Sequence, residues 1–445
     1  MLLTGWGRYP SITSQVTAPG NVDALTQELS AYASATRLIP RGAGRSYGDS
    51  ALAEQVISSR FLDNFIALDA ENLRISCGAG VTLAEVLRLC VPRGLFPPVL
   101  PGTKYVSVGG AIAADIHGKN HHVDGTFCDH VESISLALAS GELAHCSRTE
   151  HSDLFHATCG GMGLTGVIIE ARLRLETISS VSITTEANAT ANLKESLTLL
   201  NEHNEKKYVV AWVDCLARGA ALGRGIIHCG HHSNAGKLQH RESSSIGVPF
   251  TTPGFLLNRA TMATFNSLYF KRHSRAAGAR QQHYDSFFFP LDSIRNWNRL
   301  YGSRGFLQYQ FVVPDKSAES CLTEILGAVS SAGKGSFLAV LKRFGAANQN
   351  LLSFPRAGLT LTLDFKFERS LLSLLDELDA MVLAHGGRIY LAKDARMSEA
   401  VFKQGYPNWE AFKAIKDRVD PDGLFASMQS NRLGLSGADM GSSTA

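Results

Sequence analysis

The chain has 445 residues, 44% of them hydrophobic and 19% charged, with a formal net charge of +3. At about 150 residues per domain, this length predicts two or three domains or two interleaved lobes. The charged share is below the roughly 25% of an average globular chain, which excludes a disordered, highly charged protein. The mild net charge excludes a dedicated nucleic-acid binder, so no nucleic-acid partner is expected.

The sequence carries no visible export or membrane-spanning signal. It has no run of about 18 apolar residues, and its N-terminus, MLLTGWGRYP, lacks the basic and apolar regions of a secretory signal. The 8 cysteines are scattered without a C-x-x-C pair, as in a reducing compartment. We expect a cytoplasmic protein, with peripheral contact to the inner membrane and a periplasmic location both left open.

The first third of the chain predicts alternating short strands and helices. Asn21 is placed to cap a helix that ends near Tyr32. Thr82 and Glu85 form a T-x-x-E capping box for a helix that ends near Pro92. Short strands are expected at 37–40, 73–77, 131–139 and 167–175, and the first runs directly into a glycine-rich loop.

The middle of the chain predicts an antiparallel sheet. Strands are expected at 306–313, 337–344, 360–367 and 388–393, with helices at 314–329 and from a Ser370 cap to the glycines at 386–387. This order is typical of a ferredoxin-like sheet with its helices on one face. The other face would present polar side chains, which need a ligand, a partner domain or solvent: Gln308, Gln310, Lys342, Thr360 and Thr362.

Two glycine motifs indicate close approach of the backbone to another group. The loop from Gly42 to Gly48 follows a strand but misses the dinucleotide fingerprint by one residue, so phosphate binding and an ordinary turn both stay open. The segment from Gly161 to Gly166 matches G-x-G-x-x-G in letters, but a helix precedes it and a strand follows. Because the fingerprint needs the reverse order, we reject a Rossmann site there. A glycine turn against a flat cofactor remains an alternative.

Histidines, lysines and a basic-aromatic stretch supply the other candidates. The histidines at 117–122 and at 228–232 are each expected in a loop, and they lack a second ligand cluster at zinc spacing, so no metal site is predicted. The stretch 269–275, with Arg280 nearby, is either a solvated loop or an edge that recognises membrane or phosphate. Lys342 and Lys393 lie among apolar residues, where a lysine has a lowered pKa and serves as a base or binds an anion.

Taken together, these motifs resemble the decaprenylphosphoryl-β-D-ribose 2′-oxidases, a family of the vanillyl-alcohol-oxidase-like flavoproteins. The resemblance runs from about Gly5 to Leu433 and is carried by PRGAGRSYGDSAL, PVLPGTKYVSVGGAIAADIHGKNHH, GGMGLTGVI, LQYQFVVP, VLKRFG and YLAKDAR. It implies an α+β protein with the two-lobed FAD-binding fold of the vanillyl-alcohol-oxidase type and an antiparallel-sheet substrate domain. The implied limits are 1–180 for the FAD domain, 181–396 for the substrate domain, 397–435 for a segment returning to the FAD domain, and 436–445 for a flexible tail.

The resemblance also implies an FAD site. The first glycine loop would hold the pyrophosphate, and the isoalloxazine would lie between several later segments. The implied cofactor residues are Arg41, Gly42, Ala43, Gly44, Arg45, Ser46, Tyr47, Gly48, Asp49, Gly102, Ser107, Val108, Gly109, Gly110, Ala114, Asp115, Ile116, His117, Val167 and Tyr390. Related covalent flavoproteins carry a histidine where this chain has Arg45, and no cysteine is nearby, so noncovalent FAD is expected.

The implied catalytic residues are Lys393 and His117, and the implied substrate residues are Tyr47, Gln310, Lys342, Thr360 and Thr362. In the mycobacterial enzymes the strand that matches 360–365 carries an asparagine and a reactive cysteine, whereas this chain has two threonines there. Oxidation of an alcohol needs no thiolate, so this departure affects covalent inhibition rather than the reaction.

The expected reaction is FAD-dependent oxidation of a secondary sugar hydroxyl to a ketone, at C2′ of a polyprenyl-phosphate ribose. The resemblance further implies a short-chain NAD(P)H reductase as partner, which would complete epimerisation to arabinose for the cell wall. The closest alternative is a flavin oxidase of a soluble polyol or sugar with the same fold. A third hypothesis is a non-catalytic flavin- or sugar-binding protein. The two lysines and the aromatic pocket argue against it.

Overall fold

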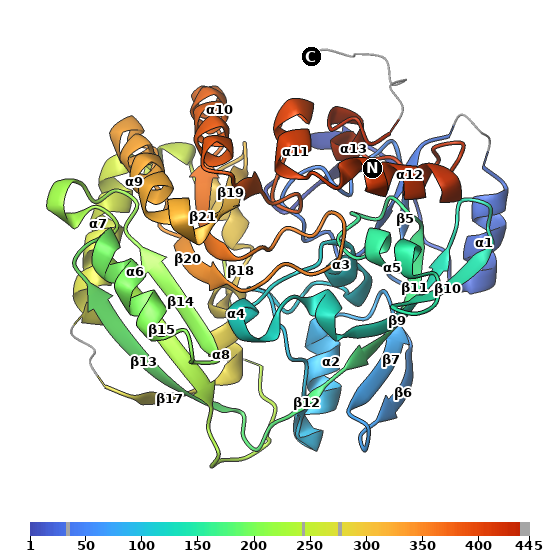
Figure 1. Cartoon of the computed structure of the whole chain (residues 1–445), viewed down its shortest axis with the longest axis horizontal. Coiled ribbons are helices and arrows are strands. Elements are labelled where there is room, and N and C mark those ends of the chain that lie inside the picture. Colours follow the sequence, from blue (N-terminus) through green and yellow to red (C-terminus); the bar gives the residue numbers. More distant parts are fainter. Residues whose placement is uncertain (33–35, 243–244, 275–277, 437–445) are drawn as a thin grey trace.

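The computed structural model describes residues 1–32, 36–242, 245–274 and 278–436 of the chain. It has two lobes side by side, each built around β-sheet (Figure 1). The first lobe contains a parallel three-stranded sheet and a five-stranded antiparallel sheet. Their strands are β3 (Gln15–Thr17), β4 (Leu38–Arg41) and β5 (Gln55–Ser58), and β6 (Phe65–Asp69), β7 (Arg74–Gly78), β9 (Val131–Ala137), β10 (Leu143–Ser147) and β11 (Val167–Arg174).

Helices in the first lobe begin where the capping residues predict. Asn21 caps α1 (Val22–Ser30) by accepting the Ala24 N–H at 2.8 Å. Thr82 and Glu85 form both hydrogen bonds of the capping box of α2 (Leu83–Cys90). The other helices are short: α3 (Val108–Ala113), α4 (His121–Asp124) and α5 (Ser152–Thr158). Short strand pairs complete the lobe, β1 (Leu2–Thr4) with β2 (Ser11–Thr13) and β8 (Leu95–Phe96) with β12 (Glu176–Thr177).

The second lobe is an eight-stranded sheet in the order β17-β13-β15-β14-β20-β21-β19-β22. It contains two strand–helix–strand–strand–helix–strand units with mirrored strand order, joined where β14 pairs with β20. One unit is β13 (Ser182–Thr190), α6 (Leu193–Glu202), β14 (Tyr208–Val213), β15 (Gly225–His232), α7 (Arg259–Ser274) and β17 (Arg280–His283). The other is β19 (Phe306–Val313), α9 (Asp315–Ala332), β20 (Ala339–Phe344), β21 (Gly358–Lys366), α10 (Arg369–Ala384) and β22 (Arg388–Ile389). The ferredoxin-like prediction is therefore confirmed for the second unit, and the first repeats it.

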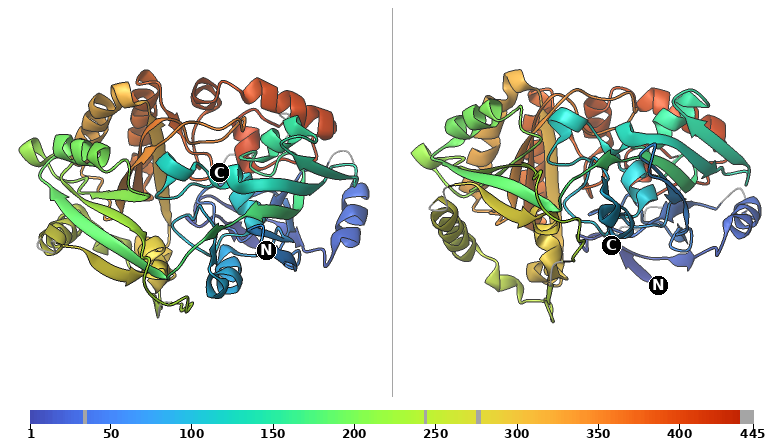
Figure 2. Two further views of the ribbon diagram at one scale, coloured as in Figure 1. Left: turned by 60° about the horizontal axis from the view of Figure 1, so that its bottom comes forward. Right: turned by 90° about the horizontal axis from the view of Figure 1, so that it is seen from below.

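The helices of this sheet do not all cover one face. α6, α9 and α10 pack on the outer face, whereas α7 lies on the opposite side of the sheet (Figure 2). The Tyr269 ring of α7 packs 4.6 Å from the Trp212 ring of β14. The loop from β15 into α7 also contains β16 (Ile246–Gly247), which pairs with β18 (Ile294–Arg295), and α8 (Tyr284–Phe288) follows β17.

After β22 the chain returns to the first lobe. Leu38 of β4 bridges to Phe425, and the Leu38 N–H donates to the Leu424 carbonyl at 2.8 Å. The helices of this segment lie over the first lobe in Figure 1: α11 (Glu399–Gly405), α12 (Trp409–Val419) and α13 (Met428–Arg432). The domain limits expected from the sequence stay predictions.

Four local predictions are wrong. Ser370 is inside α10 rather than its cap, which is Glu368. The last strand ends at Ile389, so Lys393 lies in the turn that follows. The basic-aromatic stretch is the end of helix α7, except Arg275, which lies outside the described residues, and the second histidine cluster belongs to strand β15 rather than a loop. Ser436 is buried and donates to Ser430 at 2.6 Å; the rest of the expected tail lies outside the described residues.

Candidate active site

One large cavity, of about 1040 Å³, runs from the first glycine loop to the inner face of the eight-stranded sheet. This exceeds the usual upper range of about 1,000 Å³ for sites of drug-sized ligands. Most of the residues that were predicted for the cofactor or substrate line it. They are Arg41, Gly42, Ala43, Gly44, Arg45, Ser46, Tyr47, Gly102, Ser107, Gly109, Gly110, Ala114, Ile116, His117, Val167, Gln310, Lys342, Thr362, Tyr390 and Lys393.

The first glycine loop lies against the start of helix α3. The Ser107 hydroxyl caps α3 by accepting the Gly110 N–H, and it also accepts the Ala43 N–H, each at 3.3 Å. A Cβ on Gly42 would lie 2.1 Å from that hydroxyl oxygen, so a larger residue there would displace the Ser107 side chain from these hydrogen bonds. The guanidinium of Arg45 stacks 4.5 Å from the Trp6 ring centroid, and its Nε has no hydrogen-bond partner in the described chain. Exposed amides and an arginine at a loop suit a phosphate group.

The second glycine segment also faces the cavity. Met162, Gly163 and Gly166 line it, between the end of α5 and the start of β11. The helix comes before this turn and the strand after it, as the sequence indicates, so the segment is no Rossmann fingerprint. It supplies instead a glycine-rich wall on which a flat group can lie.

His117 stands at the boundary between the two lobes. Its Nε2 lies 3.0 Å from the amide nitrogen of Gln310, which also donates to the Thr360 hydroxyl at 3.2 Å. Burial, with Lys342 and other nearby cations, holds the pKa of His117 well below its usual value. Because an amide NH₂ only donates, Nε2 must accept, and the proton of the neutral ring is then on Nδ1. Nδ1 is buried and has no partner among the described residues, so it is available to donate to a bound group.

Lys393 faces the same space from the turn after β22. Its Nζ lies 3.7 Å from the centroid of the Tyr47 ring. Burial lowers the pKa of Lys393 to about 7, opposed by the charge of Asp364 and reinforced by Lys342. A lysine with this pKa is largely an uncharged amine slightly above neutral pH and can accept a proton.

Asp364 in β21 is fully buried, and its charge acts on Lys393. It accepts a hydrogen bond of 2.5 Å from the Gln308 amide and one of 3.4 Å from the Tyr301 hydroxyl. Burial raises the pKa of Asp364 to about 7, so this carboxyl and Lys393 titrate as an interacting pair. Asp364 and Gln308 belong to the functional environment, but the sequence pattern singled out only Gln308.

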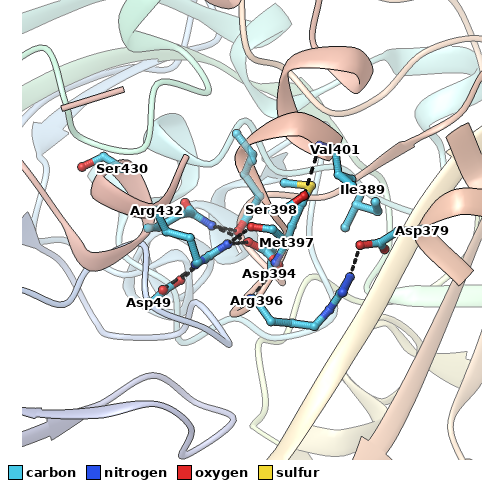
Figure 3. Close-up of polar contacts among 12 residues, drawn as sticks. Asp49, Asp379, Ile389, Asp394, Arg396, Met397, Ser398, Val401, Ser430 and Arg432 are labelled. Carbon is cyan, nitrogen blue, oxygen red and sulfur yellow. Dashed lines mark hydrogen bonds and ion pairs between the residues drawn. The ribbon is translucent and has the colours of Figure 1, made fainter. Parts of the chain in front are cut away.

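A buried ionic network holds the turn that carries Lys393 (Figure 3). Arg432 of α13 lies between Asp49 and Asp394, with ion pairs of 2.8 and 2.9 Å. Asp394 also accepts the backbone N–H groups of Arg396 and Met397 at 2.9 and 2.8 Å. Burial raises the pKa of Asp49 to about 6 although Arg432 opposes this change. The returning C-terminal segment therefore fixes both the glycine loop and the lysine turn.

Five predicted residues do not line the cavity. Asp49 pairs with Arg432, and Gly48 packs so tightly that a Cβ there would lie 1.7 Å from the Asp394 carbonyl oxygen. Thr360 is fully buried behind Gln310, and Val108 is in the core. The Asp115 carboxylate accepts from Asn348, Asn350 and Ser353 in the long β20–β21 loop. These five residues therefore pack or form polar contacts next to the site without lining the cavity.

Several cavity residues were missed by sequence reasoning. Trp212 and His228 face the cavity from β14 and β15, and Tyr269 and His273 face it from α7. Lys119, two residues after His117, also lines it. The alternation of β14 and β15 could have placed Trp212 and His228 on one face, but nothing in the sequence shows which face meets the other lobe.

Comparisons with known proteins agree with this geometry. Residues 13–147 match the family described as FAD binding domain, and residues 261–433 match the one described as D-arabinono-1,4-lactone oxidase. The chain is 36% identical over 449 residues to the decaprenylphosphoryl-beta-D-ribose oxidase of Mycolicibacterium smegmatis, covering 97% of each chain. The chain belongs to this oxidase family.

Other relatives match smaller shares of this chain. An uncharacterized protein of Streptomyces coelicolor is 33% identical over 80% of this chain and 100% of its own. Cytokinin dehydrogenase 3 of Arabidopsis thaliana is 30% identical over 39% of this chain and 35% of its own. The member described here is an FAD-dependent oxidoreductase with the two-lobed fold expected from the sequence.

The cavity residues fit FAD. The glycine loop with Arg45 offers a phosphate cradle, and the glycine turn at 163–166 offers a flat wall. The unpartnered Nδ1 of His117 and Nε of Arg45 are buried donors without an acceptor in the described chain, and both border the cavity. Noncovalent attachment stays a prediction; in the described chain no cysteine lines the cavity.

Proposed function

We propose that the protein oxidises the C2′ hydroxyl of a polyprenyl-phosphate ribose to a ketone. The observation that carries this proposal is Lys393, an amine with a pKa of about 7 that faces the cavity between the lobes. Bound FAD supplies the acceptor for the hydride that leaves the carbinol carbon. The hydroxyl proton passes to Lys393 Nζ, so that the loss of a hydride and a proton leaves the ketone.

Other residues position the sugar for this transfer. Gln310 is held by His117 and Thr360, and Thr362 faces the cavity two residues further along β21. The Tyr47 ring packs against the Lys393 amine, with 3.7 Å from Nζ to the ring centroid. Burial lowers the pKa of His117 and makes its ring a weak base, and its Nε2 already accepts from Gln310, so we assign removal of the hydroxyl proton to Lys393.

The decisive experiment is anaerobic reduction of the bound flavin, followed by its absorbance. We expect a ribose 1-phosphodiester with a prenyl chain to bleach the flavin, and arabinose, ribose and simple polyols to leave it oxidised. The match of residues 261–433 to the D-arabinono-1,4-lactone oxidase family favours one second candidate, an oxidase of a soluble sugar or polyol. Bleaching by a free sugar with no response to the phosphodiester would establish that candidate instead.

The keto product defines the expected partner. A ketone at C2′ that is reduced from the opposite face gives the arabinose epimer, so a short-chain NAD(P)H reductase is the class of enzyme that would consume it. Supplying such a reductase should convert the lipid-linked ribose to arabinose, as required for arabinose in a cell wall. Accumulation of unreduced ketone in the presence of active reductase would argue against the pairing.

A lipid-linked substrate also implies contact with a membrane surface. None of the described helices has both the length and the apolar character to cross a bilayer. Beside the cavity, α7 exposes Phe265 and Leu268 together with Lys271 and Arg272. Apolar side chains beside cations are typical of a peripheral contact with anionic lipid, and this arrangement supports such a contact for α7.

A further inference from the structure

Two lysines, Lys119 and Lys342, line the same cavity as Gln310 and Thr362, and they lie close enough for the charge of Lys342 to lower the pKa of Lys119. Lys342 projects from β20, and Lys119 follows His117 in the segment that separates the lobes. The Lys119 ammonium donates to the Phe288 carbonyl oxygen at 3.0 Å and lies 5.2 Å from the Phe287 ring centroid. One backbone acceptor leaves further N–H groups of this ammonium available to a ligand.

Neither lysine has a carboxylate partner among the described residues. No ion pair involves Lys119 or Lys342 in that part of the chain, and Asp292 is the one acidic residue there that lines the cavity. Asp285, close to Phe287 and Phe288 in the sequence, forms a buried 2.6 Å ion pair with Lys104. Burial and the neighbouring Lys342 lower the pKa of Lys119 to about 7, and burial lowers that of Lys342 to about 8. Without a counter-charge, burial shifts both amines toward the uncharged form, and an anionic ligand that binds beside them favours the charged form and so gains two cationic partners.

The strand register places Lys342 two steps along β21 from Asp364, the residue whose charge acts on Lys393. Lys342 is opposite Thr360 in β21, and Thr362 is the next residue on that face, about 7 Å further along the strand. Asp364, which influences Lys393, follows at the next step. Lys342 lies close enough to Lys393 for its charge to lower the pKa of Lys393, and in a ribose 1-phosphodiester only three bonds separate C2′ from phosphorus, so one sugar can place its C2′ hydroxyl at Lys393 and its phosphate at Lys342.

We propose that Lys119 and Lys342 together form an anion subsite that binds the phosphodiester of the lipid-linked sugar, an assignment that rests on the proposed function. Charge-assisted hydrogen bonds from two ammonium groups fix the sugar through its phosphate. A neutral sugar lacks this anchor and supplies neither amine with a counter-charge. The subsite thus selects phosphodiesters over free sugars, while Lys393 serves the chemistry.

Equilibrium binding to the FAD-loaded full chain tests the subsite without turnover. The probe is a 2-deoxyribose 1-phosphodiester with a short prenyl chain, which has no C2 hydroxyl to oxidise, and its Kd is followed by the flavin difference spectrum. We expect Lys119→Met to raise that Kd at least tenfold and to leave the Kd of the neutral methyl 2-deoxyriboside unchanged. Lys342→Met should act in the same direction. Lys413→Met, on the surface helix α12, is the matched control and should behave as the unaltered protein.

Several outcomes overturn the assignment. A Kd for Lys119→Met within threefold of the unaltered protein removes Lys119 from anion binding. Equal binding of the phosphodiester and the neutral riboside removes the subsite altogether. Loss of FAD from Lys119→Met would assign this lysine to the cofactor, and tighter binding of inorganic phosphate than of the diester would assign the site to free phosphate. Failure of the proposed oxidation is separate, because Lys119-dependent diester binding without flavin reduction by the ribose diester refutes the substrate and leaves the anion subsite standing.

Discussion

Replacing Lys393 with methionine should abolish most flavin reduction while leaving FAD bound. With its pKa near 7, about 90% of Lys393 is uncharged at pH 8, whereas about 0.3% of a lysine with the ordinary value of 10.5 would be. The cavity therefore provides about 300-fold more free base at that pH. General-base assistance is worth about 10²–10⁴-fold in rate, and we expect a loss in this range for single-turnover reduction per bound FAD.

The pH dependence of the same assay is a second readout. The unaltered protein should show a rate that falls about tenfold from pH 8 to pH 6, because protonation of an amine with a pKa near 7 removes the base. Lys393→Met should be slow and nearly independent of pH over this range. A variant that keeps FAD and loses less than threefold in rate, or retains the acidic limb, would show that Lys393 is not the base.

Asp364→Asn changes the pKa of Lys393 without touching the substrate. The Asp364 carboxylate raises the pKa of Lys393, so its neutralisation should lower that pKa and move the acidic limb to lower pH. Reduction at pH 6 should then be faster than in the unaltered protein, an effect that simple damage to β21 would not produce. An unchanged limb in a folded, FAD-loaded variant would refute the coupling.

Four further predictions concern the cofactor, the scaffold and the membrane. Acid precipitation should release FAD into the supernatant, since Arg45 replaces a linking histidine; flavin retained in the pellet would show a covalent bond. Arg432→Met leaves Asp49 and Asp394 buried without their cation and should cost about 3–5 kcal/mol of unfolding free energy in chemical denaturation, against under about 1 kcal/mol for Arg418→Met at an exposed pair. Gly48→Ala should yield little folded, FAD-loaded protein, because its Cβ would lie 1.7 Å from a carbonyl oxygen; normal flavin content would contradict the tight packing. Replacing Lys271 and Arg272 with glutamine should weaken sedimentation with anionic vesicles, and unchanged binding at low salt would exclude α7 as the contact.

Local signals in the sequence predicted the elements whose causes are local. Asn21, Thr82 and Glu85 identify helix starts because a capping hydrogen bond joins residues three apart. The alternation of side chains between two faces at 306–313 and 360–367 identifies β19 and β21, because this pattern also depends only on residues close together in the sequence. Ser370 was misread as a cap because the residue two before it, Glu368, already has the extended backbone of a cap.

The site was less predictable, since its residues meet through long-range packing. Family resemblance brought Lys393, His117 and Gln310 together, and the structure places all three on one cavity. Lys119 and His228 gave no such signal, because a lysine in a loop and a histidine on a strand have no local pattern that shows a cavity in front of them. Asp49 shows the opposite case, in which a residue within a cofactor motif serves an ion pair.

The two mirrored units of the eight-stranded sheet contribute different residues to the cavity. Only two residue pairs, Ala211 with Leu341 and Trp212 with Val340, join the units between β14 and β20, and the cavity extends across that seam. Gln310, Lys342 and Thr362 come from one unit, and Trp212 and His228 from the other. Mutations in the first unit can therefore reshape the far end of the cavity without disturbing the reacting end. Such substitutions can change which ligands the cavity accepts while conserving its chemistry, and amide hydrogens at the seam should exchange faster than those between β19 and β21.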